Sequence, residues 1–117
     1  MNDVIENFPA PCSDDCVELC TMYWKICLEM VQHCLTLGGK YAEPELLRLL
    51  TNCDDICELN IKFLISKSPH ADHISQACTE VCKALAGKCE SMDEKMAACG
   101  AVCRQCAEIC EAVKPRE

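Results

Sequence analysis

Residues 12–34 of the chain read CSDDCVELCTMYWKICLEMVQHC, a stretch with cysteines at 12, 16, 20, 27 and 34. An α-helix turns by about 100° per residue, so steps of 4 or 7 residues return to nearly the same side of the helix. Taking Cys16 as zero, Cys12, Cys20, Cys27 and Cys34 lie at roughly −40°, +40°, +20° and 0°. We therefore predict one helix with a narrow row of thiols along its buried face.

The remaining cysteines form three more groups with the same helical spacing, namely Cys53 and Cys57, then Cys78, Cys82 and Cys89, then Cys99, Cys103, Cys106 and Cys110. The third group spans only about 40° of its helix and the fourth about 60°. No alternation typical of strands competes with this pattern. Long helices joined by short turns favour antiparallel neighbours. We predict an all-α fold, an antiparallel up-down-up-down four-helix bundle with a cysteine-lined core.

The turns between these helices have recognisable signals. Gly38-Gly39 should stop the first helix, which begins near Ser13 or Asp14 and ends at Leu37. The second should run from Pro44 to about Lys67. We expect Ser68-Pro69 to end it and to cap the third. A capping box over residues 91–94 should open the fourth helix, which closes near residues 113–115.

This connectivity predicts which residues share each level of the bundle. One end should gather Cys12, Cys16, Leu64, His70, Ala71 and Cys110, and the other Cys34, Leu46, Cys89 and Met92. At 1.5 Å per residue, comparable heights near the middle are expected for Cys27, Cys53, Cys82 and Cys103. Thiols from all four helices should therefore converge in mid-bundle.

Length and charge limit the classes of protein. The 117 residues contain no linker or low-complexity tract, so we expect a single domain over 1–117 with a flexible N-terminal segment at 1–11. The net charge is −8 and the 11 Lys and Arg are scattered, which disfavours nucleic acid and anionic membrane. No run is apolar enough for a signal peptide or a membrane span. We expect a cytoplasmic protein whose thiols stay reduced.

Several roles are conceivable for so many thiols. Cysteine can fill a core, although leucine or isoleucine would pack better. Disulfides between i and i+4 of one helix have poor geometry, and iron–sulfur clusters draw on close loop spacings. Structural zinc needs one closed tetrahedron rather than continuous rows. Sequestration of zinc or cadmium and a thiol redox protein remain as alternatives.

Cu(I) fits the rows best because it is soft, prefers thiolate and accepts two or three sulfurs. Sulfurs about 4.6 Å apart can bridge one metal linearly, which suits the spacing of i and i+4 side chains. Each Cu⁺ that displaces one proton also leaves a buried core neutral. We therefore expect storage of multiple Cu(I) ions, with these metal ligands: Cys12, Cys16, Cys20, Cys27, Cys34, Cys53, Cys57, Cys78, Cys82, Cys89, Cys99, Cys103, Cys106 and Cys110.

Repeated Cys-x₃-Cys rows from Cys12 to Cys110 give the chain a resemblance to a known family, the cytosolic branch of the copper storage proteins. That resemblance implies a cysteine-lined bundle that stores many Cu(I) ions and assembles as a homotetramer. The second helix departs from the fullest pattern, because Leu46, Leu50 and Leu64 share its stripe. This departure implies a lower capacity and apolar plugs toward the ends.

A few other residues are candidates for peripheral roles. Tyr23, Met30, Asn60 and Met92 fall on the stripes, where a thioether or an amide oxygen could complete a copper site. We expect His70 near the entering copper, and His33 and His73 at the surface or an interface. No nucleophile is paired with a base, so we expect no enzyme. Apolar residues outside the stripes of the first two helices predict an oligomer interface.

Overall fold

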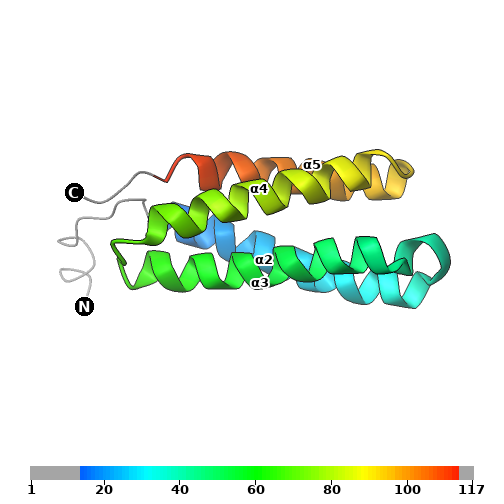
Figure 1. Cartoon of the computed structure of the whole chain (residues 1–117), viewed down its shortest axis with the longest axis horizontal. Coiled ribbons are helices and arrows are strands. Elements are labelled where there is room, and N and C mark those ends of the chain that lie inside the picture. The colour runs from blue at the N-terminus through cyan, green and yellow to red at the C-terminus, as the bar shows by residue number, and fades with distance from the viewer. Residues whose placement is uncertain (1–13, 114–117) are drawn as a thin grey trace.

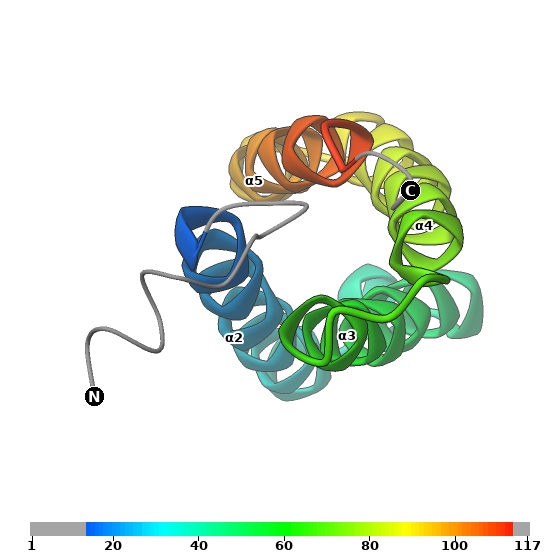
Figure 2. The ribbon, with the colours of Figure 1, turned by 90° about the vertical axis from the view of Figure 1, so that its left-hand side faces the viewer.

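The structure, a computed structural model, describes the backbone of residues 14–113 and the side chains of residues 17–113. Its helices are α2 (Asp14–Leu37), α3 (Pro44–Ile65), α4 (Ala71–Glu90) and α5 (Glu94–Glu111), with a short 3₁₀ helix, η1 (Gly39–Ala42), after α2 (Figure 1). Successive helices run in opposite directions, and the end view shows them around a common axis (Figure 2). The predicted four-helix bundle is confirmed. The expectations for residues 1–11 and for Cys12 lie outside the described residues.

The turn from α2 to α3 follows the predicted signals. Gly38 and Gly39 have φ angles of 68° and 56°, in the left-handed region that glycine adopts without steric cost. Pro44 is the first residue of α3, where its missing N–H has no partner to lose. The two glycines therefore end the first helix, as predicted.

The other two turns differ from prediction in their capping residues. The N-cap of α4 is His70, and Ser68 contributes through its Oγ, which accepts the His70 N–H at 3.1 Å. The N-cap of α5 is Asp93, whose carboxylate accepts the Met96 N–H at 3.1 Å. Ser91 instead closes α4, donating from Oγ to the Lys88 carbonyl at 2.7 Å. The predicted capping box over residues 91–94 is therefore wrong.

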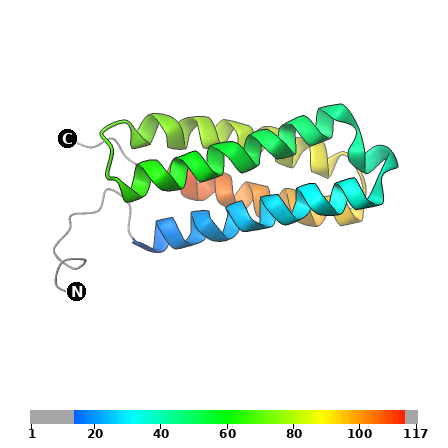
Figure 3. The same ribbon diagram turned by 90° about the horizontal axis from the view of Figure 1, so that it is seen from below.

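The bundle has two dissimilar ends (Figure 3). One end contains the turns α2–α3 and α4–α5 and is closed by Lys40, Tyr41 and Asp93; we call it the Asp93 end. The other end contains the α3–α4 turn; we call it the Leu64 end. A small apolar cluster lies there, made of Cys20, Ile61, Leu64, Ala71 and Val113. None of the described helices is long and apolar enough to cross a bilayer.

Helices α4 and α5 approach each other closely at Gly100. A Cβ atom there would lie 3.2 Å from the Ala86 carbonyl oxygen and 3.3 Å from the Cys89 Cβ. Glycine at this position lets the backbone of α5 come near the thiol row of α4. The close approach brings the cysteines of these two helices into one core.

Candidate metal-binding core

Every cysteine side chain that the structure describes is buried, and these cysteines form no disulfide with one another. The set is Cys20, Cys27, Cys34, Cys53, Cys57, Cys78, Cys82, Cys89, Cys99, Cys103, Cys106 and Cys110. None is more than 6% exposed. Cys16 lies on α2, but its side chain, like all of Cys12, is outside the described residues. Within these limits the sequence pattern placed the thiols correctly.

Four thiols from three helices form what we call the central cluster: Cys57 of α3, Cys78 and Cys82 of α4, and Cys106 of α5. Their Sγ atoms all lie within 4.8 Å of one another. The Sγ separations are 3.7 Å for Cys57 and Cys78, 3.9 Å for Cys78 and Cys82, and 4.0 Å for Cys57 and Cys106. Metal–sulfur bonds of about 2.3 Å require tetrahedral edges of roughly 3.8 Å. The spacing of these sulfurs thus suits a thiophilic metal.

A second group, Cys27, Cys53 and Cys57, overlaps the first and brings in helix α2, again with Sγ atoms within 4.8 Å of one another. Cys27 and Cys53 are 3.2 Å apart, and Cys53 lies 3.8 Å from Cys82. An interaction with Cys103 of α5 is the foremost cause that raises the pKa of Cys53. The predicted mid-bundle convergence of Cys27, Cys53, Cys82 and Cys103 is present. Because Cys57 belongs to both groups, the sulfurs form one network across all four helices.

The network continues toward both ends of the bundle. On the Leu64 side, the Sγ of Cys110 lies 3.3 Å from that of Cys78. On the Asp93 side, an interaction with Cys99 raises the pKa of Cys89, and the nearby Cys34 is also fully buried. Thiols therefore line the bundle well beyond the central cluster.

Burial favours the neutral form of these thiols, but the pKa values shift in different directions from one cysteine to the next. Burial raises the pKa of the Cys34 thiol, and nearby Cys99 raises it further. In the central cluster, hydrogen bonds from neighbouring thiols, foremost Cys106, lower the pKa of Cys57. Hydrogen bonds with Cys110 and Cys57 raise the pKa of Cys106. No Lys or Arg is buried among the described residues, so a divalent ion held by four thiolates would leave negative charge without a cation to balance it.

The predicted peripheral candidates differ in where they lie. Asn60 is fully buried among the thiols. Tyr23 is buried, yet its hydroxyl donates to Gln105 Oε1 at 3.0 Å and so takes part in a different interaction. Met30 and Met92 are half-buried. Of these four, Asn60 is the one whose side chain forms hydrogen bonds with core sulfurs, those of Cys20 and Cys110.

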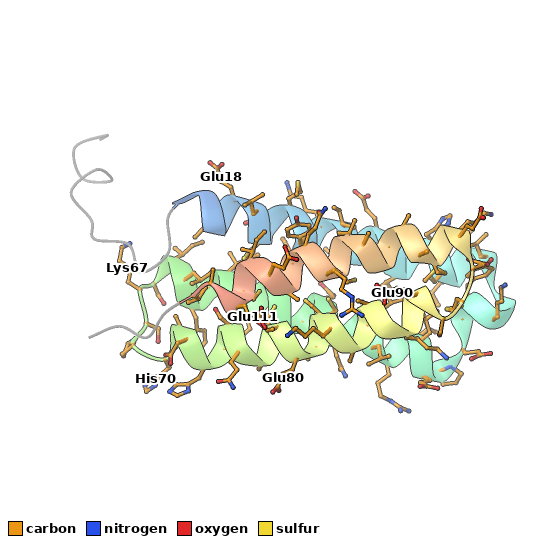
Figure 4. The ribbon with its side chains drawn as sticks, turned by 90° about the horizontal axis from the view of Figure 1, so that it is seen from above. Glu18, Lys67, His70, Glu80, Glu90 and Glu111 are labelled. Atoms are coloured by element: carbon orange, nitrogen blue, oxygen red, sulfur yellow. The ribbon has the colours of Figure 1, made fainter. Side chains whose placement is uncertain are left out.

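The histidines lie on the outside of the bundle. His33, His70 and His73 are all exposed. His70 points away from the bundle axis at the α3–α4 turn, as do Glu18 and Glu80 from the sides of the bundle (Figure 4). The rings of His70 and His73 are 6.2 Å apart. The surface positions predicted for His33 and His73 are confirmed, and His70 stands at the Leu64 end.

Among the buried polar residues that sequence reasoning missed is Ser75. Its hydroxyl donates to Asn60 Oδ1 at 2.6 Å, and only 1% of the residue is exposed. Ser75 lies three residues before Cys78, on the same face of α4. That spacing was the available signal for its burial.

Comparison with known proteins places this arrangement in a family. The profile of the family described as "Copper storage protein" (Csp) matches residues 10–115. The uncharacterized cysteine-rich protein YhjQ of Bacillus subtilis (strain 168) is 30% identical over 77 residues, which are 66% of this chain and 71% of YhjQ.

Solved structures show the same relationship. The Nmul_A1745 protein of Nitrosospira multiformis is 40% identical, with a TM-score of 0.76 over 82% of this chain and 88% of that one. The Cu(I)-bound copper storage protein BsCsp3 is 30% identical, with a TM-score of 0.77 over 86% and 95% of the two chains. Apo-Csp3 from Bacillus subtilis gives a TM-score of 0.74 at 30% identity over 86% and 96%. A cysteine-lined four-helix core and a family match over nearly the whole sequence lead to one conclusion: the chain belongs to the copper storage protein family, and its function is copper storage.

Proposed function

We propose that the chain stores many Cu(I) ions on the thiols that line its bundle core, and that all 14 cysteines, including Cys12 and Cys16, act as ligands. The observation that carries this proposal is the central cluster, where sulfurs from three helices lie within 4.8 Å of one another. Cu(I) prefers soft thiolate ligands and accepts two or three of them. A relative with the same fold, BsCsp3, is known in a Cu(I)-bound form.

Charge supports a monovalent cargo. The described core buries only three polar residues besides the thiols, namely Asn60, Ser75 and Thr79, and none of them is cationic. A Cu⁺ that replaces a thiol proton leaves the local charge unchanged, so filling can proceed to about one metal per thiol. Zn²⁺ at the same ratio would accumulate positive charge in a dry core.

A titration of the reduced apoprotein with Cu(I), followed by gel filtration and metal analysis, tests this function. We expect the protein to retain on the order of one Cu(I) per cysteine, because charge neutrality sets that ratio. Retention of only one or two ions, or displacement of Cu(I) by equimolar Zn²⁺, would contradict storage of Cu(I).

We place this storage in the cytoplasm and assign no catalytic activity to the chain. Reduced thiols are stable in the cytosol, and the cysteines described here form no disulfide among themselves. Thiols packed side by side are buried, whereas a catalytic cysteine needs an accessible thiolate. Fractionation of cells and an assay for turnover with a dithiol substrate would test the two statements.

We further propose that four copies assemble through helices α2 and α3. Large apolar side chains remain exposed on these helices, with Leu28 at 40%, Leu35 at 50%, Leu59 at 39% and Ile65 at 62%. Burial of such a surface is a typical driving force for self-association. Light scattering should give a tetramer for the native chain and smaller species for the L28E/L35E variant.

A matched control is available on the other two helices. Ala84 of α4 and Ala101 of α5 are also exposed, so A84E/A101E adds the same charge to the opposite helix pair. We expect this control to remain tetrameric. Dissociation of the control, with the L28E/L35E variant intact, would place the interface on α4 and α5 instead.

A further inference from the structure

A polar layer interrupts the sulfur core toward the Leu64 end. Asn60 lies three residues after Cys57 on α3, and Ser75 lies three residues before Cys78 on α4. Both therefore occupy positions where the thiol rows of their helices would continue. They are 0% and 1% exposed, so their polar atoms must be satisfied inside the protein.

The two residues complete each other's hydrogen bonds. Ser75 Oγ lies 2.6 Å from Asn60 Oδ1, a separation typical of O–H···O and shorter than the usual N–H···O range. The oxygen of the amide therefore faces Ser75. Its Nδ2 then faces two sulfurs, at 3.6 Å from Cys110 Sγ and 3.9 Å from Cys20 Sγ.

The layer combines one residue from each helix, Cys20 of α2, Asn60 of α3, Ser75 of α4 and Cys110 of α5. Beyond it lie the apolar side chains of Ile61, Leu64 and Ala71, which offer no polar partner. Copper bound by Cys20 and Cys110 would therefore meet the Asn60 amide between the central cluster and this apolar end. A metal-bound thiolate keeps part of its negative charge, and an N–H donor stabilises that charge.

We propose that Asn60 is a positioning residue, which donates hydrogen bonds from Nδ2 to the Cu(I)-bound thiolates of Cys20 and Cys110 while Ser75 holds its orientation. This inference rests on the proposed function. It assigns Asn60 a role different from the oxygen ligand that its stripe position suggested. Because Oδ1 is engaged by Ser75, the amide presents donors to the sulfurs rather than a lone pair to the metal.

Competition between the protein and a Cu(I) chelator tests the role of the amide. Asn60→Leu removes the donors, and loss of a group that supports metal ligands typically costs about 10- to 100-fold in affinity. We expect a loss of at least about tenfold at a subset of the sites. Asn52→Leu, an exposed change on the same helix, should leave every site unchanged.

Ser75→Ala tests the orientation separately, since it retains Asn60 and frees only the amide oxygen. We expect a smaller loss of affinity in the same direction, and no further loss when Ser75→Ala is added to Asn60→Leu. If circular dichroism of the apoprotein shows that Asn60→Leu prevents folding, the Cu(I) affinity of Ser75→Ala is compared with that of Asn52→Leu instead.

Spectroscopy distinguishes a donor from a ligand. The side-chain ¹⁵N signal of Asn60 should shift on copper loading, and X-ray absorption should show sulfur neighbours around Cu(I). A copper–oxygen distance that Asn60→Leu removes would overturn the donor role. Affinities of Asn60→Leu and Ser75→Ala equal to that of Asn52→Leu would also overturn it, whereas a wild-type chain that retains only one or two ions would defeat the proposed function itself.

Discussion

The middle of the bundle and its Asp93 end are built from different side chains. The middle is filled by thiols, among them those of the central cluster. Toward the Asp93 end the largest fully buried side chains are instead apolar, namely Leu46, Leu50, Leu85 and Met96. This end is also closed by polar contacts, since Asp93 accepts a hydrogen bond from Tyr41 and pairs with Lys40 at 3.0 Å.

The difference separates folding from storage. Cysteine is a small apolar residue whose burial contributes less than that of leucine or methionine. The Asp93 end therefore supplies much of the packing that holds the helices together before metal arrives. The middle can then keep reactive groups in place without having to provide most of the stability.

The largest expected effect is on the stability of the apoprotein. Leu85→Ala should lower the free energy of unfolding by about 2–5 kcal/mol, because it leaves a cavity at a fully buried position. Cys82→Ala, one turn earlier on the same helix, removes a smaller group and should cost clearly less. Denaturant titrations of the reduced apoproteins, monitored by far-ultraviolet circular dichroism, give both values. Copper capacity should stay close to native in Leu85→Ala.

Two results would contradict this contrast between the middle and the Asp93 end. One is a larger loss of unfolding free energy in Cys82→Ala than in Leu85→Ala. The other is a reduced apoprotein that shows a coil spectrum and folds only on copper addition. Either result would mean that metal, rather than apolar packing, holds the bundle together. High helicity of the metal-free chain is the expected baseline, because Asp93 caps α5 and the apolar faces of the helices already pack against one another.

The second effect is on copper affinity. Cys57→Ser/Cys106→Ser removes two members of the central cluster, and Cys57 also belongs to the neighbouring three-thiol group. We expect the first copper to bind at least about tenfold more weakly, equivalent to about 1.4 kcal/mol. Cys34→Ser/Cys89→Ser removes the same number of buried thiols toward the Asp93 end and should leave the first copper unaffected. Chelator competition at low loading measures the difference; equal losses would show that no cluster is preferred.

A third and smaller effect concerns the rate of uptake. Copper should enter at the Leu64 end, where the sequence pattern predicts Cys12 and Cys16 near Cys110, and it should pass near His70 and move inward by exchange between thiols. Replacing those three cysteines with serine should slow uptake a few-fold, with most of the capacity retained. Stopped-flow transfer of Cu(I) from a chelator gives the rates. A slower Cys34→Ser/Cys89→Ser variant would place the entrance at the Asp93 end.

The smallest effect is the response of the Asp93 end to acid. The hydrogen bond from Tyr41, followed by the contacts with Lys40 and the Met96 N–H, lowers the pKa of Asp93 well below its ordinary value. A carboxylate with a depressed folded-state pKa contributes stability above its unfolded pKa, and that contribution is lost as the pH falls below about 4. Thermal unfolding of the apoprotein at several pH values should show this loss. Asp93→Asn should reduce this dependence of stability on pH, whereas Glu94→Gln, a change at an exposed neighbouring residue, should leave it unaltered.

Much of the fold could be read from residue spacing alone, because helical periodicity is local. Steps of 3, 4 and 7 between cysteines placed each row on one face, and Gly38-Gly39 and Pro44 marked the first turn correctly. The misplaced caps have tertiary causes. Asp93 serves as N-cap of α5 while Lys40 and Tyr41, more than fifty residues earlier in the sequence, bind the same carboxylate.

By itself the sequence determined that thiols line the interior of a four-helix bundle, since the angle between two residues on one helix follows from their separation along the chain. Only the tertiary structure decided which sulfurs meet, because that depends on how far each helix slides and rotates against its neighbours. The pairing of Cys27 with Cys53, the grouping of Cys57 with Cys106, and the bond from Ser75 to Asn60 all join different helices. Their distances arise from packing across the core, which no local pattern encodes.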